Sequence, residues 1–298
     1  MKITIIGANN NGGLEKDKII LTKLLQEHNF DVDARDNRDF APLSEDTDLC
    51  IHLEVVDERC FGKRNILIPN QEWFMRKWLP SLHKFEAIFC KSRYAYNIFN
   101  NYHNNVHYTG FTSIDCYVPS EKAKECFHAA GNSKAKGTQL LIYAWDNFTD
   151  ARLHLATRTI DTATITNESI SAHYYLSKEE YSRLRNSTLI HIYPSQVEGF
   201  GHCINEAMSC GAVVITTDYP PMNEFKCNFY IPAQVEYTLP NSLGSGVYID
   251  PASIRKTVEE VLARNDLHEL GKRSREYFLQ SDKEFRERFM SLFNTLKI

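Results

Sequence analysis

The sequence predicts an α/β protein with two Rossmann-like domains, each built on a parallel sheet. Short apolar runs alternate with helical segments of amphipathic spacing, which is typical of a parallel sheet covered on both faces. This alternation occurs as two series that separate near Tyr117-Val118-Pro119. We therefore expect a first domain over residues 1–118, a second domain over residues 119–280 and a C-terminal helix over residues 281–298.

The first series opens with a βαβ unit. Residues 3–6 form an apolar run closed by Gly7, and residues 14–28 have helical apolar spacing. Gly12 and Gly13 lie in the loop between them, and a short apolar run at 30–32 completes the unit. Further strands are expected over residues 49–53, 66–68, 87–90 and 106–108, with helices over residues 73–82 and 94–102.

The second series repeats the alternation with clearer helix boundaries. Strands are expected over residues 125–129, 153–157, 173–176, 189–193, 213–216 and 229–231, and helices over residues 138–145, 177–185, 205–210 and 251–263. Ser177 with Glu180 is a capping-box pattern, and Asp250-Pro251 suits a helix start. Apolar positions on one face of residues 283–298 predict a final helix. The polar, glycine-containing stretch 241–246 predicts a surface loop.

Composition excludes several classes of protein. The chain has 298 residues, of which 43% are hydrophobic and 24% charged, as in an ordinary globular protein. Its net charge is −4 and no stripe of lysine or arginine occurs, so we expect no general nucleic-acid binding. The eight cysteines form no C-x-x-C pair, which is typical of reduced core cysteines rather than zinc ligands or disulfides.

Apolar runs are too short for a membrane span. None approaches the roughly 20 residues that a transmembrane helix needs. The first predicted strand follows directly after Met1-Lys2, which leaves no room for a signal peptide. We therefore expect a cytoplasmic protein without a transmembrane segment.

Residues 189–211 are the most informative stretch of the chain. A buried strand is expected to end at Tyr193, and Gly199 and Gly201 then allow a sharp turn and the close approach of a ligand. Helical spacing from His202 onward ends at Gly211, a typical C-cap residue. A strand, glycine loop and helix in this order direct backbone N–H groups and a positive dipole end at an anion.

Two carboxylates accompany this anion site. Glu198 lies on the glycine loop and Glu206 lies eight positions later in the helix. Carboxylates accept hydrogen bonds, so the pair suits a polyhydroxyl ligand such as ribose rather than the anion itself. We expect Glu206 to face the ligand and to contribute little to packing.

The extended pattern beginning at Pro194 resembles a known signature. P-S-x-x-E-G-F-G-x-x-x-x-E-A-M-x-x-G-x-x-V-x-T is similar to the motif of the retaining, nucleotide-sugar-dependent glycosyltransferases of family 4. The resemblance implies a GT-B fold, in which two Rossmann-like domains face a cleft and the last helix crosses back to the first domain. It also implies a hexosyltransferase that moves a sugar to an acceptor hydroxyl with retention of configuration.

The same resemblance assigns roles on the second domain. It implies that Glu206 holds the donor ribose and that Glu198 is a catalytic residue beside the donor sugar. Backbone groups of Gly201, His202 and Cys203 are expected at the diphosphate or the sugar. The donor is expected to be a UDP- or GDP-sugar, which is a substrate, so no cofactor is predicted.

Residues 131–137 (GNSKAKG) resemble the phosphate-binding loop of the family, G-[RK]-x-x-x-K-G. Lys136 matches its lysine, whereas Asn132 and Ser133 stand where an arginine is common. We expect Lys136 and Ser133 to bind the donor, with solvated surface lysines as the alternative. Tyr175 is a further donor-binding candidate, for the base, with plain packing as its alternative.

First-domain candidates rest on weaker signals. Gly12 and Gly13 match a G-G-x-E loop of the family, although any first turn of a βαβ unit can carry glycines. His52 is a catalytic candidate because family members often place a histidine near the anomeric carbon, with a satisfied half-buried histidine as the alternative. Asn70, Glu72 and Trp73 follow an expected strand at its carboxyl end, and we assign them to the acceptor side.

A metal is not expected. The D-x-D spacings at 31/33 and 46/48 lie far from the motif and read as solvated acidic residues. Lys136 and the helix start at His202 are expected to offset the charge of the diphosphate instead. The acceptor itself (glycan, lipid, small molecule or protein) is left open.

Two alternatives remain. An epimerase or a phosphorylase is a rival on the same architecture, although the motif supplies no epimerase acid/base pair and the chain is short for a phosphorylase. A degenerate, non-catalytic GT-B protein that serves as a nucleotide-sugar-binding subunit or scaffold is the other. The intact Glu198, Glu206 and Lys136 oppose that alternative, whereas the short first domain and the missing arginine favour it.

Overall fold

The computed structural model describes residues 1–10, 12–39, 43 and 46–296. The chain divides into two compact units. Unit 1 comprises Met1–Ile114, Thr238–Gly244 and Ser281–Ile298, and unit 2 comprises Asp115–Tyr237 and Ser245–Gln280. The chain thus leaves unit 1 after Ile114, slightly before the boundary that the sequence predicts at 118.

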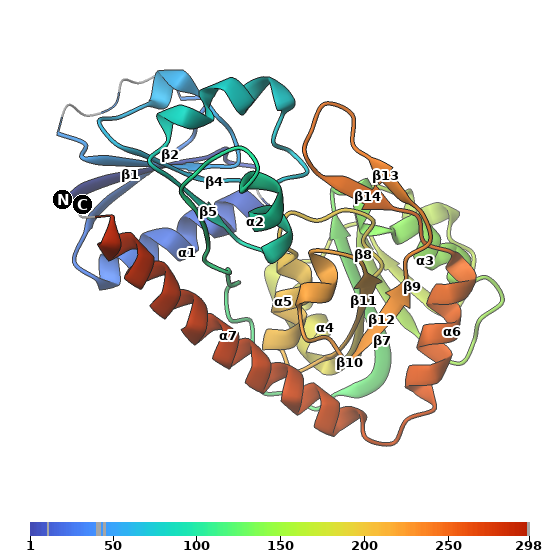
Figure 1. Ribbon diagram of the computed structural model, residues 1–298. Coiled ribbons are helices and arrows are strands. Elements are labelled where there is room, and N and C mark those ends of the chain that lie inside the picture. Colours follow the sequence, from blue (N-terminus) through green and yellow to red (C-terminus); the bar gives the residue numbers. More distant parts are fainter. Residues whose placement is uncertain (11, 40–42, 44–45, 297–298) are drawn as a thin grey trace. The chain divides into compact units, whose positions relative to one another are not determined.

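Unit 1 contains a six-stranded parallel sheet in the order β2-β1-β3-β4-β5-β6. Figure 1 labels β1, β2, β4 and β5 of this sheet. Its strands are β1 (Lys2–Ile6), β2 (Asp31–Arg35), β3 (Leu49–Leu53), β4 (Asn65–Ile68), β5 (Ala87–Cys90) and β6 (Val106–Tyr108). Strands β3, β4 and β5 are buried along their whole length, which is why they read as continuous apolar runs.

In the described residues of unit 1, two α-helices and two 3-10 helices connect strands, and the shorter 3-10 helix is Glu58–Cys60. Helix α1 (Gly13–Glu27) follows β1, and α2 (Arg93–Phe99) begins at Ser92, whose side chain accepts a hydrogen bond from the amide of Ala95. The helical segment expected over 73–82 is present in part, as a 3-10 helix rather than an α-helix. Residues Arg76–Lys84 form a 3-10 helix that contains Pro80. Proline cannot donate a backbone hydrogen bond and collides with the carbonyl four residues earlier in an α-helix.

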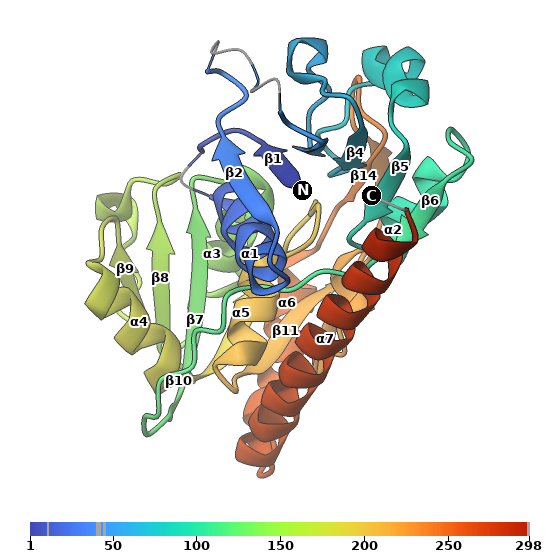
Figure 2. The same cartoon turned by 90° about the vertical axis from the view of Figure 1, so that its left-hand side faces the viewer.

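Unit 2 also contains a six-stranded parallel sheet, in the order β12-β11-β10-β7-β8-β9. Its strands are β7 (Ala123–Gly131), β8 (Leu153–Thr157), β9 (Ile170–His173), β10 (Thr188–Tyr193), β11 (Val213–Asp218) and β12 (Phe229–Pro232). Figure 2 shows β7, β8 and β9 side by side. The strand expected over 173–176 instead ends at His173, and Tyr174 and Tyr175 lie exposed beyond it.

The helices of unit 2 are α3 (Thr138–Ala144), α4 (Lys178–Ser187), α5 (His202–Ser209), α6 (Pro251–Leu262) and the first half of α7 (Leu267–Thr295). The predicted capping box of Ser177 and Glu180 is present at the start of α4. Asp250 caps α6, and Pro251 occupies its first turn. These helices pack on a core that includes Trp145, Ile190 and Val213.

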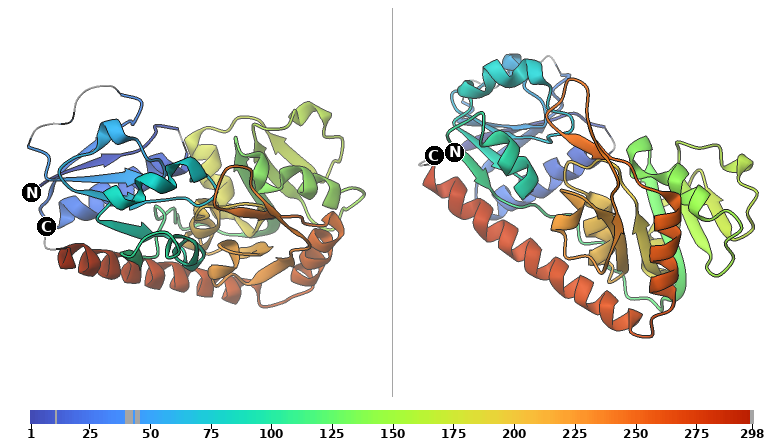
Figure 3. Two further views of the ribbon diagram at one scale, coloured as in Figure 1. Left: turned by 45° about the horizontal axis from the view of Figure 1, so that its top comes forward. Right: turned by 45° about the vertical axis from the view of Figure 1, so that its right-hand side comes forward.

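Helix α7 is longer than the sequence indicates. The expected helix began near residue 283, whereas α7 starts at Leu267, and residues 297–298 lie outside the described part (Figure 3). Its second half packs into unit 1 through aromatic pairs with ring centroids 4.9–5.5 Å apart: Phe285 with Phe111, Phe289 with Phe89, and Phe293 with Phe30. The polar first half gave no apolar stripe strong enough to predict.

Residues 239–244 form a hairpin tip between β13 (Glu236–Thr238) and β14 (Ser245–Val247). The surface loop expected over 241–246 is wrong in part, because Leu243 is only 9% exposed and packs with Phe74 in the core of unit 1. The amide of Gly244 donates to the carbonyl of Gln71 at 2.9 Å. Leu243 anchors the tip, but its polar neighbours in the sequence did not indicate a buried residue.

Candidate functional site

The candidate site of unit 2 lies at the carboxyl ends of β7 and β10 and at the start of α5. Strand β10 ends at Tyr193, and α5 begins directly after Gly201. Gly201 has a φ of 111°, a left-handed conformation that other residues rarely adopt, and a Cβ atom there would lie 3.1 Å from the ring of Phe225. The left-handed conformation of Gly201 thus allows α5 to begin directly after the glycine loop.

Glu198 and Lys136 lie together at this edge. The Lys136 ammonium forms an ion pair with Glu198 Oε1, and the Ser195 hydroxyl donates a 2.7 Å hydrogen bond to the same oxygen. The side chain of Lys136 is 15% exposed, and that of Glu198 is 8% exposed. Lys136 and Glu198 are thus neighbours in space, although they are far apart in sequence. Lys136 was predicted to bind the donor phosphate, and Glu198 was predicted to lie beside the donor sugar.

A tight backbone contact holds Lys136 in this position. Gly137, the next residue, has a φ of 70°, and a Cβ atom there would lie only 2.0 Å from the carbonyl oxygen of Pro194. The Gln196 amide donates to the Ala135 carbonyl at 2.8 Å. Ser133 lies at the start of the short 3-10 helix Lys134–Lys136 in the same loop. The loop that resembles a phosphate clamp is therefore packed against the start of the motif.

His128 lies beneath this loop and was missed at the sequence level. It is fully buried, and its ring bonds the Thr138 hydroxyl at 3.0 Å and the Ile192 carbonyl at 2.7 Å. Burial lowers the pKa of this histidine to about 4, so it is neutral at neutral pH. It joins β7, α3 and β10 under the site.

Glu206 is more buried than the sequence suggests. Its side chain is 3% exposed, and its Oε2 lies 3.2 Å from a guanidinium nitrogen of Arg185 on α4. The Arg185 guanidinium also lies 5.0 Å from the ring centroid of Tyr181. The expectation that Glu206 contributes little to packing is therefore wrong. Arg185 was missed because a basic residue in the last turn of a helix usually interacts only with the helix dipole.

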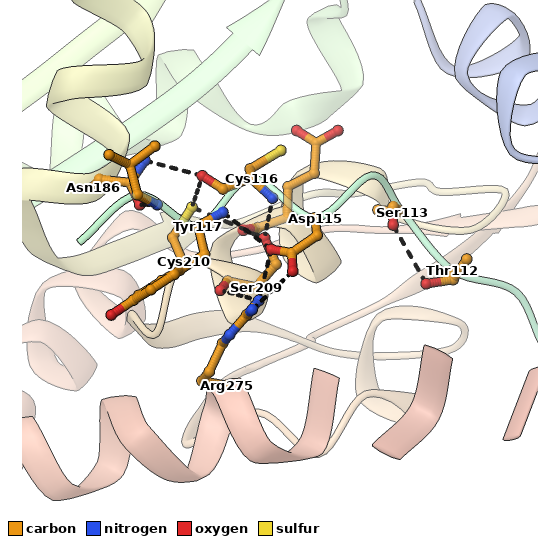
Figure 4. A network of polar contacts seen from close by, with 11 residues as sticks. Thr112, Ser113, Asp115, Cys116, Tyr117, Asn186, Ser209, Cys210 and Arg275 are labelled. Carbon is orange, nitrogen blue, oxygen red and sulfur yellow. Dashed lines mark hydrogen bonds and ion pairs between the residues drawn. The ribbon is translucent and has the colours of Figure 1, made fainter. Parts of the chain in front are cut away.

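The last turn of α5 is anchored by the segment that opens unit 2 (Figure 4). The Ser209 hydroxyl accepts a 3.0 Å hydrogen bond from the Cys116 amide and donates to the Glu206 carbonyl at 2.7 Å. Arg275 of α7 pairs with both oxygens of Asp115 and donates to the Ser209 carbonyl at 2.8 Å. These contacts set the position of the helix that carries Glu206.

The remaining donor-side candidates are more accessible. His202 and Cys203 are half-buried in the first turn of α5, and the His202 ring lies 5.3 Å from that of Phe200. Tyr175 is 71% exposed after β9. The first turn of α5 and Lys136 supply positive groups for an anion. Glu198 and Glu206 supply carboxylates from the same loop and helix.

Unit 1 holds the other candidates. Gly12 precedes α1, and its amide donates to the Asn10 side chain at 2.9 Å, whereas Gly13 is the first residue of the helix. Lys18 of α1 is buried and donates to the Gly7 carbonyl at 3.0 Å, which ties α1 to the end of β1. The glycine loop thus stands at the carboxyl edge of the unit 1 sheet.

His52 lies inside the sheet of unit 1 rather than at its edge. It is 0% exposed, bonds the Asn65 side chain at 3.1 Å, and packs edge-on against Phe61 and Phe85. Burial lowers its pKa to about 4. This placement favours a core histidine over a catalytic one, although the His52 Nδ1 has no hydrogen-bond partner among the described residues.

The acceptor-side candidates surround the end of β4. Asn70 and Glu72 are half-buried, whereas Trp73 is 64% exposed. Asn70 donates to Glu54 and accepts from Lys91. In the part of the chain that the structure describes, no group of three or more histidine, cysteine, aspartate or glutamate side chains is placed to hold a metal. Among those same residues, no helix is long and apolar enough to cross a membrane.

Comparison with protein families gives one match, to the model described as Glycosyl transferases group 1, over residues 119–277. This range contains the whole candidate site of unit 2. A search of curated protein sequences finds no match.

Solved structures show the same fold at low identity. A sucrose-phosphate synthase from Thermosynechococcus elongatus has a TM-score of 0.75 at 13% identity, with 99% of each chain covered. A glycosyltransferase from Rickettsia africae has a TM-score of 0.69 at 10% identity, covering 99% of this chain and 98% of that one. The Anabaena protein HepE, solved with UDP and glucose, has a TM-score of 0.69 at 13% identity, with 99% of each covered. The predicted α/β fold of the GT-B type is confirmed.

Proposed function

Because this chain belongs to the glycosyl transferases group 1 and is a transferase enzyme, we propose that it moves a sugar from a nucleotide-sugar donor to an acceptor hydroxyl. The observation that carries the proposal is the joint position of Lys136, Glu198 and the start of α5 at one sheet edge. A donor needs cationic and dipolar groups for its diphosphate and hydrogen-bond acceptors for its sugars, and this edge supplies both.

In the proposed complex, Lys136 and the N–H groups of the first turn of α5 hold the diphosphate. The leaving group carries the electron pair of the broken C1–O bond, and these groups stabilise its growing negative charge without needing a metal. Lys136 already pairs with Glu198, so donor binding replaces or shares that ion pair. Glu198 then accepts hydrogen bonds from hydroxyls of the donor sugar, with Ser195 orienting it.

Glu206 holds the ribose in this proposal. Arg185 pairs with one carboxylate oxygen and stabilises the buried charge. Retention of configuration is proposed from the resemblance of the motif, with the acceptor oxygen attacking C1 as the diphosphate leaves and the acceptor proton passing to a phosphate oxygen. A UDP- or GDP-sugar is the proposed donor, and the UDP bound in the Anabaena protein supports a nucleotide of this class.

Calorimetry with UDP and GDP, together with nucleotide release from a panel of UDP- and GDP-sugars, tests the proposal. Lys136→Met should weaken diphosphate binding by about 10- to 100-fold, the range for losing charge-assisted hydrogen bonds. Lys134→Met is the matched control, because Lys134 is exposed in the same loop and should matter little. Release should persist in excess chelator.

Three outcomes separate the alternatives. Failure to bind either nucleotide contradicts the proposal. Binding without release or transfer from any sugar nucleotide favours the non-catalytic nucleotide-sugar-binding subunit instead. Release that stops in chelator and returns with manganese contradicts metal independence while leaving sugar transfer intact.

A further inference from the structure

Glu54, at the carboxyl end of β3, has an unusual backbone conformation. Its φ is 69°, in the left-handed region. The amide of Val55 donates to the carbonyl of Leu53 at 2.8 Å, which closes a three-residue turn around Glu54. Such a turn with a positive φ is strained for any residue other than glycine. Strained residues of this kind concentrate at binding and catalytic sites, because surrounding contacts must hold them in place.

A chain of polar contacts holds the Glu54 side chain. The Asn70 amide nitrogen donates to Glu54 Oε2 at 3.2 Å, and the Asn70 oxygen accepts from the Lys91 ammonium at 3.1 Å. Lys91 in turn forms an ion pair with Asp17 of α1. Lys91 and Asp17 are 3% and 1% exposed. Because the Asn70 amide is engaged at both ends, it fixes the orientation of the Glu54 carboxyl group.

This cluster lies where parallel sheets bind ligands. Glu54, Asn70 and Lys91 follow the carboxyl ends of β3, β4 and β5, which are neighbours in the sheet. Glu54 is only half-buried, so a ligand can reach it, whereas the ion pair behind it is sealed. Open α/β sheets bind their ligands at this edge.

The charge state of Glu54 is also unusual. Burial raises its pKa to about 7, Lys91 and the Asn70 hydrogen bond oppose that rise, and Asp17 adds to it. A carboxyl that served only to balance Lys91 would contact the ammonium directly. Here Lys91 pairs with Asp17, and Glu54 contacts the neutral Asn70.

We propose that Glu54 is the residue of unit 1 that binds the acceptor, through a hydrogen bond from a sugar hydroxyl to its carboxylate. Asp17, Lys91 and Asn70 are positioning residues that hold the carboxylate in its strained turn. The inference rests on the proposed function, because it supplies the acceptor side of sugar transfer. The acceptor class is therefore a polyhydroxylated molecule, a mono- or oligosaccharide.

The test uses the full-length, labelled protein on an array of immobilised mono- and oligosaccharides without donor. Glu54→Gln keeps the shape of the side chain and removes its charge, and it should reduce glycan retention by about 10-fold or more. Glu58→Gln is the control, an exposed glutamate on the same unit that pairs with Lys84. UDP and GDP binding by calorimetry should be unchanged in both variants.

Glu54→Gly separates binding from a structural role. Glycine adopts the turn without strain, so the Tm should stay the same or rise while glycan retention falls. Asn70→Leu removes a hydrogen bond that lowers the pKa of Glu54, so glycan retention should require a higher pH than in the wild type, with Lys91 and Asp17 still in place.

Several results would overturn the inference. These are equal retention by wild type and Glu54→Gln, a clear fall in Tm for Glu54→Gly, or no retention of any saccharide by the wild type. Nucleotide binding that persists in each of these cases leaves the proposed donor site intact, so the two failures can be told apart.

Discussion

At the scale of single residues, the ion pair of Arg185 and Glu206 is both structural and functional. The two side chains are 12% and 3% exposed, so neither charge is well solvated. Arg185→Met removes the counter-charge and should destabilise the protein by roughly 3 kcal/mol, the cost of breaking a buried ion pair. It should also weaken nucleotide binding. Urea denaturation and calorimetry measure the two effects.

Two further variants check this reasoning. Arg183→Met on the same helix should change stability little, because Arg183 is exposed. The double variant Arg185→Met/Glu206→Gln should recover part of the lost stability, since both charges are then removed together. The charge argument is wrong if the double variant loses more free energy of unfolding than the two single variants lose together.

The residues of the site were only partly predictable from sequence. The motif predicted that Glu198 lies on the glycine loop and Glu206 on the following helix, because the local sequence sets this geometry. The prediction that Lys136 also binds the donor rested on a second motif, residues 131–137, which resemble the phosphate-binding loop of the family. Arg185 could not be found, because the approach of α4 to α5 is set by packing in the folded unit. His52 was placed at a strand end, but the sheet buries it among aromatic rings.

At the scale of elements, the loop before α3 depends on a single glycine. Gly137→Ala should destabilise the protein by about 3 kcal/mol or more, because a left-handed φ costs roughly 1–2 kcal/mol and the new Cβ collides with the Pro194 carbonyl. Relief of the collision moves Lys136 away from Glu198, so diphosphate binding should fall as well. Thermal unfolding and calorimetry with UDP and GDP measure both.

Gly131 provides the control at the other end of the same loop. Its φ is 55°, also left-handed, but a Cβ atom there meets nothing within 4 Å. Gly131→Ala should therefore carry only the conformational cost of about 1–2 kcal/mol and leave diphosphate binding unchanged. Equal effects of the two substitutions would show that the contact with Pro194 does not matter.

Element prediction succeeded where a local pattern decides the structure. Strands β3, β5, β6 and β8 have the predicted boundaries. Strands β3 and β5 are buried along their whole length, whereas β6 and β8 are buried only in part. The helix expected over 73–82 forms as a 3-10 helix from Arg76 to Lys84, because Pro80 is not compatible with the interior of an α-helix. The first half of α7 and the hairpin β13–β14 were missed because they depend on tertiary contacts, such as that of Leu243 with unit 1.

At the scale of the whole molecule, three buried histidines predict sensitivity to acid. Burial lowers the pKa of His52 and His128 to about 4 and of His191 to about 3. The unfolded chain, with histidine pKa values near 6.5, therefore binds more protons than the folded one below that pH. Stability should fall as the pH drops from about 6.5 towards 4, by up to roughly 1.4 kcal/mol per pH unit for each histidine.

Urea unfolding at a series of pH values measures this slope. His52→Leu is the informative variant, because the Asn65 oxygen that bonds His52 still accepts from the Gly62 amide at 3.0 Å. It should remove about one third of the histidine contribution to the slope. If the slope is unchanged, His52 does not contribute to the acid sensitivity. Sugar transfer near pH 7.5 should survive in this variant if His52 has a packing role.

The second half of α7 should contribute strongly to the stability of unit 1. Phe289 is 1% exposed and packs against Phe89 and Phe293. Phe289→Ala should cost about 3–5 kcal/mol, as for other buried aromatic truncations. Leu279→Ala is the control on the same helix, since Leu279 is 50% exposed. Urea midpoints that agree between the two variants would contradict this role.

The distribution of unit 1 along the chain sets an order of events during synthesis. Unit 1 holds the first 114 residues but also Ser281–Ile298, whereas unit 2 ends at Gln280. During synthesis, Phe30, Phe89 and Phe111 lack their partners on α7 until unit 2 has been translated. The native packing of unit 1 is thus completed only after residues 281–295 have been made. Until then, three aromatic side chains of the nascent chain lack their native cover, which makes this interval the most exposed to chaperones and to aggregation.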